Sequence, residues 1–70
     1  MDQVFTVGAR VTLTAAGRRC RDKNGKPDLG EELTVTGYRG FDTNRWIVEV
    51  AGSDGRKDVY FEHCIVPRGR

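Results

Sequence analysis

The chain of 70 residues contains 37% hydrophobic and 31% charged residues, and its formal net charge is +2 at pH 7. This length fits one small domain, residues 1–70, and the composition excludes an intrinsically disordered chain, which would be less apolar and further from neutrality. Its apolar runs are too short to cross a bilayer and its N-terminal segment lacks the apolar block of a secretion signal. We therefore expect a cytoplasmic protein with no membrane partner.

Short runs of alternating apolar and polar residues, separated by clusters of glycine, asparagine and aspartate, predict an all-β chain. The first run covers residues 10–14 and points Val11 and Leu13 to the same face. Residues 15–30 are expected to form a long loop, because an Asn-Gly pair and a proline interrupt any regular element and no segment shows helical periodicity.

Two further runs, residues 31–38 and 45–51, predict the central strands. In the first of them, Gly37 falls on the inward-facing phase, which predicts a bulge or a sharp bend. In the second, Trp46 shares its phase with Val48, which places the indole ring in the core. The segment "RGFDTN", residues 39–44, separates the two runs.

The last third of the chain predicts a hairpin and a short terminal strand. The sequence "GSDG" makes a tight connection to a strand over residues 56–61, with Asp58 and Tyr60 facing outward. One turn of 3₁₀ helix at residues 62–64 then leads to a strand around Ile65. The inward residues of all five strands, closed by Trp46, predict one core: Val11, Leu13, Leu33, Val35, Val48, Val50, Val59, Phe61 and Ile65.

The stretches "VGARVTLTAAG" and "LGEELTVTGY" place a glycine-led strand before a loop, a second glycine and an alternating strand. This arrangement resembles the KOW-type domains of transcription factors and ribosomal proteins, and it also looks like a pattern common in small phage proteins. The resemblance implies a five-stranded SH3-like barrel, with a long loop after strand 1 and a 3₁₀ turn before strand 5.

The stretch "WIVEVAGSDGRKDVYF" is similar to the third and fourth strands of plasmid-encoded type II dihydrofolate reductases, which end in a Val-Gln-Ile-Tyr motif. Tyr60 matches the tyrosine, while Asp58 stands where that family has the glutamine that contacts both ligands. In that family four copies share one pore-like active site. Four carboxylates at this position would repel one another and the phosphates of a dinucleotide. A reductase is therefore kept as a further alternative only.

Residue types that carry catalysis or bind metals are sparse. His63 is the one histidine, and it lies beside Cys64 with no second ligand pair at close spacing, so no metal and no cofactor are expected. The glycines lie in turns and no serine has a nucleophile-elbow context, so no catalytic residue is predicted and the protein is expected not to be an enzyme. Two cysteines, Cys20 and Cys64, are too few for a disulfide scaffold and are expected to be free thiols.

Positive charge is concentrated in "GRRCRDKNGK", residues 17–26. Five cations and one carboxylate there give +4, while the other seven cations and nine carboxylates give −2. Cations on a loop can neutralise phosphates and release counterions, and outward-facing aromatic rings can stack on unpaired bases. The alternatives are a loop that is merely solvated and tyrosines that cover the core. The candidate binding residues are Arg18, Arg19, Arg21, Lys23, Lys26, Tyr38, Arg39, Phe41, Arg45 and Tyr60.

These observations predict a non-enzymatic binding module whose partner is nucleic acid, RNA or DNA, bound through the basic loop and the exposed aromatic residues. The alternative is a protein partner, such as a host protein bound by a phage or mobile-element protein. In that case the long loop and a loop over residues 39–45 would form the contact, with the aromatic residues as anchors. The near-neutral net charge favours this alternative, because dedicated nucleic-acid binders usually carry more positive charge.

Overall fold

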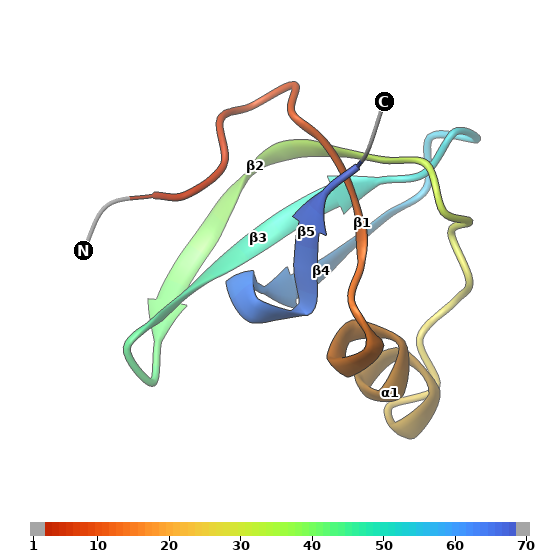
Figure 1. Ribbon diagram of the computed structural model, residues 1–70, viewed down its shortest axis with the longest axis horizontal. Coiled ribbons are helices and arrows are strands. Elements are labelled where there is room, and N and C mark those ends of the chain that lie inside the picture. Colours follow the sequence, from red (N-terminus) through yellow and green to blue (C-terminus); the bar gives the residue numbers. More distant parts are fainter. Residues whose placement is uncertain (1–2, 69–70) are drawn as a thin grey trace.

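The computed structural model describes residues 3–68, in which five strands form one antiparallel sheet accompanied by one α-helix (Figure 1). The sheet has the strand order β4-β3-β2-β1-β5. Its five strands and the turn before β5 follow one another in the predicted order. They are β1 (Arg10–Leu13), β2 (Leu33–Asp42), β3 (Arg45–Ala51), β4 (Lys57–Phe61), η1 (Glu62–Cys64) and β5 (Ile65–Pro67). The prediction of five strands and a 3₁₀ turn is confirmed.

The prediction of a continuous loop over residues 15–30 is wrong, because Ala15–Lys23 form helix α1. Thr14 caps the start of the helix, since its side-chain oxygen accepts a hydrogen bond from the backbone N–H of Gly17 at 3.1 Å. Alanine, arginine and lysine, which favour helices, make up most of α1. Because Gly17 is the one buried residue of the helix, α1 has no apolar stripe from which a helical period can be recognised.

Helix α1 packs against η1 through a close approach at Gly17. A Cβ atom on Gly17 would overlap the carbonyl oxygen of Cys64 and would lie 3.1 Å from the carbonyl carbon of Cys64 and 3.2 Å from Cβ of Leu13. The backbone N–H of Thr14 donates to the same Cys64 oxygen at 2.9 Å. The absence of a side chain at residue 17 therefore lets the first turn of the helix rest on the backbone of η1.

The hairpin of β2 and β3 is longer than the sequence predicts. Strand β2 continues through residues 39–42, and the expected loop over residues 39–45 is reduced to a turn at Thr43 and Asn44, which have φ angles of 53° and 60°. Two such left-handed residues match the twist of paired strands in a tight hairpin. In Figure 1 this hairpin extends away from the other strands to the left. The bulge predicted at Gly37 is confirmed, since the register with β3 shifts between Val35 and Gly37.

The buried core contains most of the predicted residues together with others. Its members are Phe5, Val11, Leu13, Leu29, Leu33, Val35, Val48, Val50, Tyr60, Cys64 and Ile65. The predicted phase of β4 is wrong. Tyr60 pairs with Val48 and is only 3% exposed, whereas Val59 and Phe61 are half-buried. Because three large apolar residues are adjacent in β4, its alternation is ambiguous, and the pairing with β3 decides which side chain enters the core.

Three core residues, Phe5, Leu29 and Cys64, lie outside the strands and were not predicted to be buried. Trp46, predicted to close the core, is only half-buried. Within residues 3–68, the one helix is neither long nor apolar enough to cross a membrane.

Candidate binding surface around helix α1

Four of the five cations of the basic segment lie on helix α1, and two of them form an exposed pair. Arg19 and Lys23 are both exposed, and their spacing of one helical turn places them on the same face. Neither side chain has a hydrogen-bond or ion-pair partner among residues 3–68. Their charges therefore remain available for a negatively charged partner.

The other two cations of α1 are held by neighbours. Arg18 donates through Nη1 to the backbone oxygen of Leu13 at 3.1 Å. Arg21 donates through Nε to Asp22 at 3.0 Å, and its Nη1 lies 3.6 Å from Asp28. The hydrogen bond to Asp22 raises the pKa of Arg21. Arg18 keeps an exposed charge, whereas the charge of Arg21 is balanced within the fold.

Lys26 is engaged within the fold, contrary to its predicted place on a free basic loop. Its Nζ donates to Oδ1 of Asp58 at 2.9 Å and to the backbone oxygen of Val59 at 2.9 Å. The same ammonium lies 4.9 Å from the centre of the Tyr60 ring. Asp58, the residue at the glutamine position of the reductase motif, is thus an ion-pair partner with a side chain only 17% exposed.

The predicted outward position of Tyr60 is wrong, because its ring lies in the core. Burial is the main cause that raises the pKa of Tyr60 to about 12. Tyr38 is half-buried, and its hydroxyl group both donates to the backbone oxygen of Phe5 and accepts from the backbone N–H of Phe5, each at 2.8 Å. Neither tyrosine presents a free ring for stacking; Tyr38 instead anchors the N-terminal segment.

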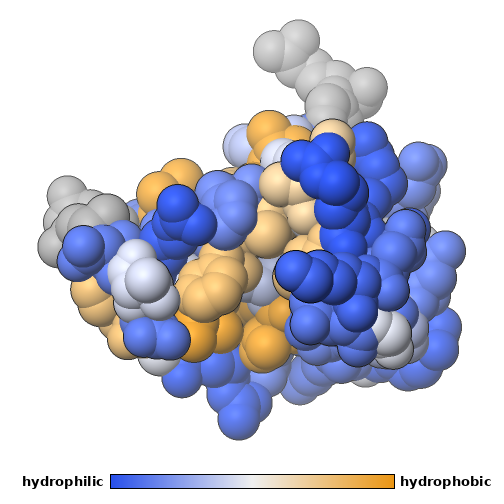
Figure 2. Space-filling view, turned by 90° about the horizontal axis from the view of Figure 1, so that it is seen from below, coloured by the Kyte–Doolittle hydropathy of each residue, from blue (hydrophilic) through white to orange (hydrophobic). Residues whose placement is uncertain are grey.

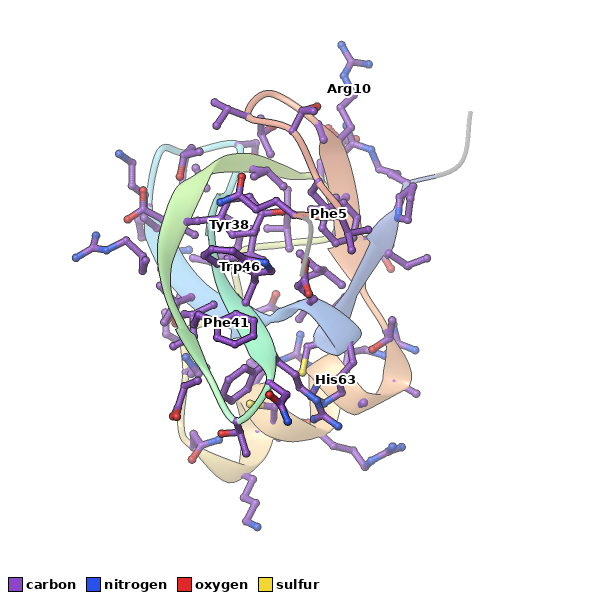
Figure 3. All side chains as sticks on the ribbon, turned by 90° about the vertical axis from the view of Figure 1, so that its left-hand side faces the viewer. Phe5, Arg10, Tyr38, Phe41, Trp46 and His63 are labelled. Atoms are coloured by element: carbon purple, nitrogen blue, oxygen red, sulfur yellow. The ribbon has the colours of Figure 1, made fainter. Side chains whose placement is uncertain are left out.

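An aromatic row runs along the β2–β3 hairpin, and only its outer end is exposed. Trp46 contacts Tyr38 at a ring-centre distance of 5.3 Å and Phe41 at 5.1 Å, both edge to face (Figure 3). In a regular strand, residues three positions apart point to opposite faces. Tyr38 and Phe41 nevertheless share a face, because the register with β3 shifts between Tyr38 and Gly40. Phe41 is 46% exposed. The expectation that Phe41 is exposed is confirmed.

The two remaining predicted cations lie on β2 and β3. Arg39 donates through Nη1 to Glu49 at 2.7 Å, while Glu49 also accepts from the hydroxyl group of Thr36 at 2.7 Å. The bond from Thr36, followed by that from Arg39, lowers the pKa of Glu49. Arg45 is exposed, and its Nη1 lies 3.1 Å from Nδ1 of His63. Arg39 is therefore paired with a carboxylate, whereas Arg45 contacts an imidazole ring.

A mainly apolar hollow of about 280 Å³ lies beside α1, and its walls come from the helix, the residues after it, β3 and β4. Its lining residues are Cys20, Asn24, Lys26, Ile47, Val59, Tyr60 and Phe61. Figure 2 views the molecule from the side on which α1 lies and shows hydrophobic side chains gathered between hydrophilic ones. Arg19 and Lys23 are each followed in the chain by a residue that lines the hollow: Cys20 on the helix and Asn24 directly after it.

This arrangement can bind a ligand that combines negative charge with a flat or apolar group. Residues 3–68 contain no group of three or more His, Cys, Asp or Glu side chains placed to hold a metal ion. Comparison with known protein families, curated proteins and solved structures finds no match to this chain. The assignment of function therefore depends on the surface itself.

The sequence analysis missed the hollow because its lining comes from separate segments. Two of these residues, Ile47 and Val59, lie on the face of their strands opposite the core. An apolar residue at an outward position of a strand is a weak signal, since single exposed apolar residues are common. The pairing of β3 with β4 is what brings Ile47 next to Phe61.

Proposed function

We propose that the protein is a non-enzymatic binding module that binds single-stranded nucleic acid through helix α1 and the adjoining hollow. The observation that carries this proposal is the exposed pair Arg19 and Lys23, which lacks a carboxylate partner within residues 3–68 and whose next residues in the chain, Cys20 and Asn24, line an apolar hollow. Phosphates would contact the two cations, and an unpaired base would contact the apolar wall or the exposed ring of Phe41. An SH3-like barrel, as the sequence resemblance implies, is the scaffold we propose for this surface.

Single strands fit this surface better than a duplex. Only an unpaired base can leave the stack and enter a hollow or lie on an aromatic ring, whereas a duplex offers mainly its phosphates. The site also has few free cations, which gives modest, salt-sensitive affinity. These features support a binding mode in which stacking and apolar contacts add to a small electrostatic contribution.

The proposal is tested by fluorescence anisotropy with labelled single-stranded and double-stranded RNA and DNA at several salt concentrations. The double variant Arg19→Ala/Lys23→Ala should weaken single-strand binding. It should also reduce the slope of log K against log salt by about 1.4, because each lost phosphate contact contributes about 0.7. The matched control Arg10→Ala/Lys57→Ala removes the same charge from exposed residues of β1 and β4, and should leave the slope close to that of the parent.

A protein partner is the second candidate, and the apolar hollow together with exposed Phe41 favours it. An apolar side chain of the partner would fill the hollow, and arginines would lie at the rim, as in the anchor residues of protein interfaces. If the parent protein shows no salt-dependent binding to any nucleic acid, the proposal of nucleic-acid binding is refuted and a protein partner, encountered by a phage or mobile-element protein in its host, becomes the first candidate. A reductase is not proposed, since Asp58 is bound to Lys26.

A further inference from the structure

The two cysteines of the chain, distant in sequence, meet where helix α1 packs on η1. Cys64 belongs to η1 and is 2% exposed. Cys20 lies on α1 one turn after Gly17, the residue whose missing side chain lets the helix rest on the Cys64 backbone. Cys20 also packs against the buried core cluster that contains Cys64. The same contact that docks the helix thus turns Cys20 toward Cys64.

The two thiols differ in their exposure. Cys20 is half-buried and lines the hollow, and its sulfur accepts a hydrogen bond from Nδ2 of Asn24 at 3.4 Å. The sulfur of Cys64 lies 3.6 Å from Nε2 of His63 and is covered by the core. Burial is the main cause that raises the pKa of Cys64, and the neighbouring Cys20 contributes to the same shift. A reagent in solution can therefore reach the half-buried thiol of Cys20 more easily than the buried thiol of Cys64.

We propose that Cys20 and Cys64 are an oxidation site, at which a small disulfide such as oxidised glutathione converts the two thiols into one intramolecular disulfide. The thiolate of Cys20 attacks one sulfur of the reagent, forms a mixed disulfide and releases one glutathione thiolate. The thiolate of Cys64 then attacks the sulfur of Cys20 and releases the second glutathione. Two protein thiols are oxidised by two electrons, one disulfide is reduced to two thiols, and both protons leave with the glutathione.

The product would join α1 covalently to η1. Because the cross-link closes most of the chain into one loop, it should stabilise the folded state mainly by restricting the unfolded chain. The helix that carries Arg19 and Lys23 would also be fixed against the rest of the molecule. This inference is independent of the proposed function, since it concerns the reaction of the two sulfurs and not the partner bound by the helix.

The test treats the native protein with oxidised glutathione and measures its intact mass without a reducing agent. The expected product is a monomer that has lost two hydrogen atoms, with a peptide that joins the segments of Cys20 and Cys64 after digestion. Its thermal unfolding midpoint should rise by roughly 10 °C and should return to the initial value after reduction. A stable glutathione adduct on the parent, a disulfide-linked dimer, or a cross-link that lowers the midpoint would overturn the proposal.

Two variants separate the steps of the reaction. Cys64→Ala should stop at the mixed disulfide on Cys20, and Cys20→Ser should react much more slowly, because its remaining thiol is buried. If Cys64→Ala does not fold, two other measurements test the proposal: the rate at which Cys20→Ser reacts with oxidised glutathione, and the peptide map of the oxidised parent. Equal rates for Cys20→Ser and the parent would show that Cys20 is not the first sulfur to react.

Discussion

Replacing Gly17 by alanine should destabilise the protein, although the same change in most helices is favourable. Helix propensity alone predicts that alanine stabilises an interior helix position by about 1 kcal/mol relative to glycine. In α1, however, the new Cβ would overlap the carbonyl oxygen of Cys64 and press on Cβ of Leu13 at 3.2 Å. Both neighbours are buried and one is backbone, so the helix itself must move.

The expected size follows from two costs that oppose the gain in propensity. Overpacking of a tight contact costs about 1 to 3 kcal/mol. Displacing the helix also weakens the hydrogen bond from the Thr14 N–H to the Cys64 oxygen, now 2.9 Å, at a cost of about 1 kcal/mol. The free energy of unfolding should therefore fall by about 1 to 3 kcal/mol. For a chain of this length the total is about 3 to 10 kcal/mol, so the change is large.

Urea unfolding followed by circular dichroism measures this change. Arg19→Ala is the matched control, because it also introduces alanine into α1 but at an exposed position, and it should alter the free energy of unfolding by less than about 0.5 kcal/mol. A Gly17→Ala protein that is as stable as the parent, or more stable, would show that α1 does not rest on the backbone of η1.

The remaining predictions concern the two tyrosines. Tyr38→Phe removes the hydroxyl group that bonds both backbone polar groups of Phe5, and should lower the free energy of unfolding by about 1 to 3 kcal/mol in urea titrations. It should also accelerate hydrogen exchange at the Phe5 amide, and unchanged exchange there would contradict the anchoring role. Tyr60 has a pKa raised to about 12 in the folded protein, above the ordinary value of about 10, so the folded state favours the neutral phenol. The stability that this provides is fully present below about pH 10 and should be lost as the pH rises toward 12. In unfolding experiments across this range, Tyr60→Phe should flatten the loss relative to the parent, and parallel curves for the two proteins would refute the assignment.

The strands were predictable because alternation is a local signal, and the burial of their inward residues fixes the register. Residues 10–14 and 45–51 show this clearly, since Val11 and Val48 are fully buried where the pattern places them. Strand β4 shows the limit of the signal, because Val59, Tyr60 and Phe61 satisfy either phase. Only the long-range pairing of Tyr60 with Val48 resolves it.

Helix α1 and much of the candidate surface were not predictable in the same way, because they depend on contacts between distant segments. The helix buries little of its own surface and depends on the cap at Thr14 and on the approach of Gly17 to η1. The basic segment seemed to present five equivalent cations. In the structure they differ in whether their charge is paired. Lys26, for example, forms an ion pair with Asp58 of β4, which lies far along the chain.

The contacts of Lys26 also affect the backbone groups that edge strand β4 exposes. Strand β4 is an edge strand, and edge strands expose backbone N–H and C=O groups that can template pairing with another chain. At Val59, in the middle of β4, the N–H donates to Oδ1 of Asp58 at 2.7 Å and the oxygen accepts from Nζ of Lys26 at 2.9 Å. One ion pair thus occupies both backbone hydrogen-bonding groups of Val59, which a strand from a second molecule would need, and it places two partly buried charges beside that strand. At Val59, the side chains of Lys26 and Asp58 thus block the pairing of β4 with another strand.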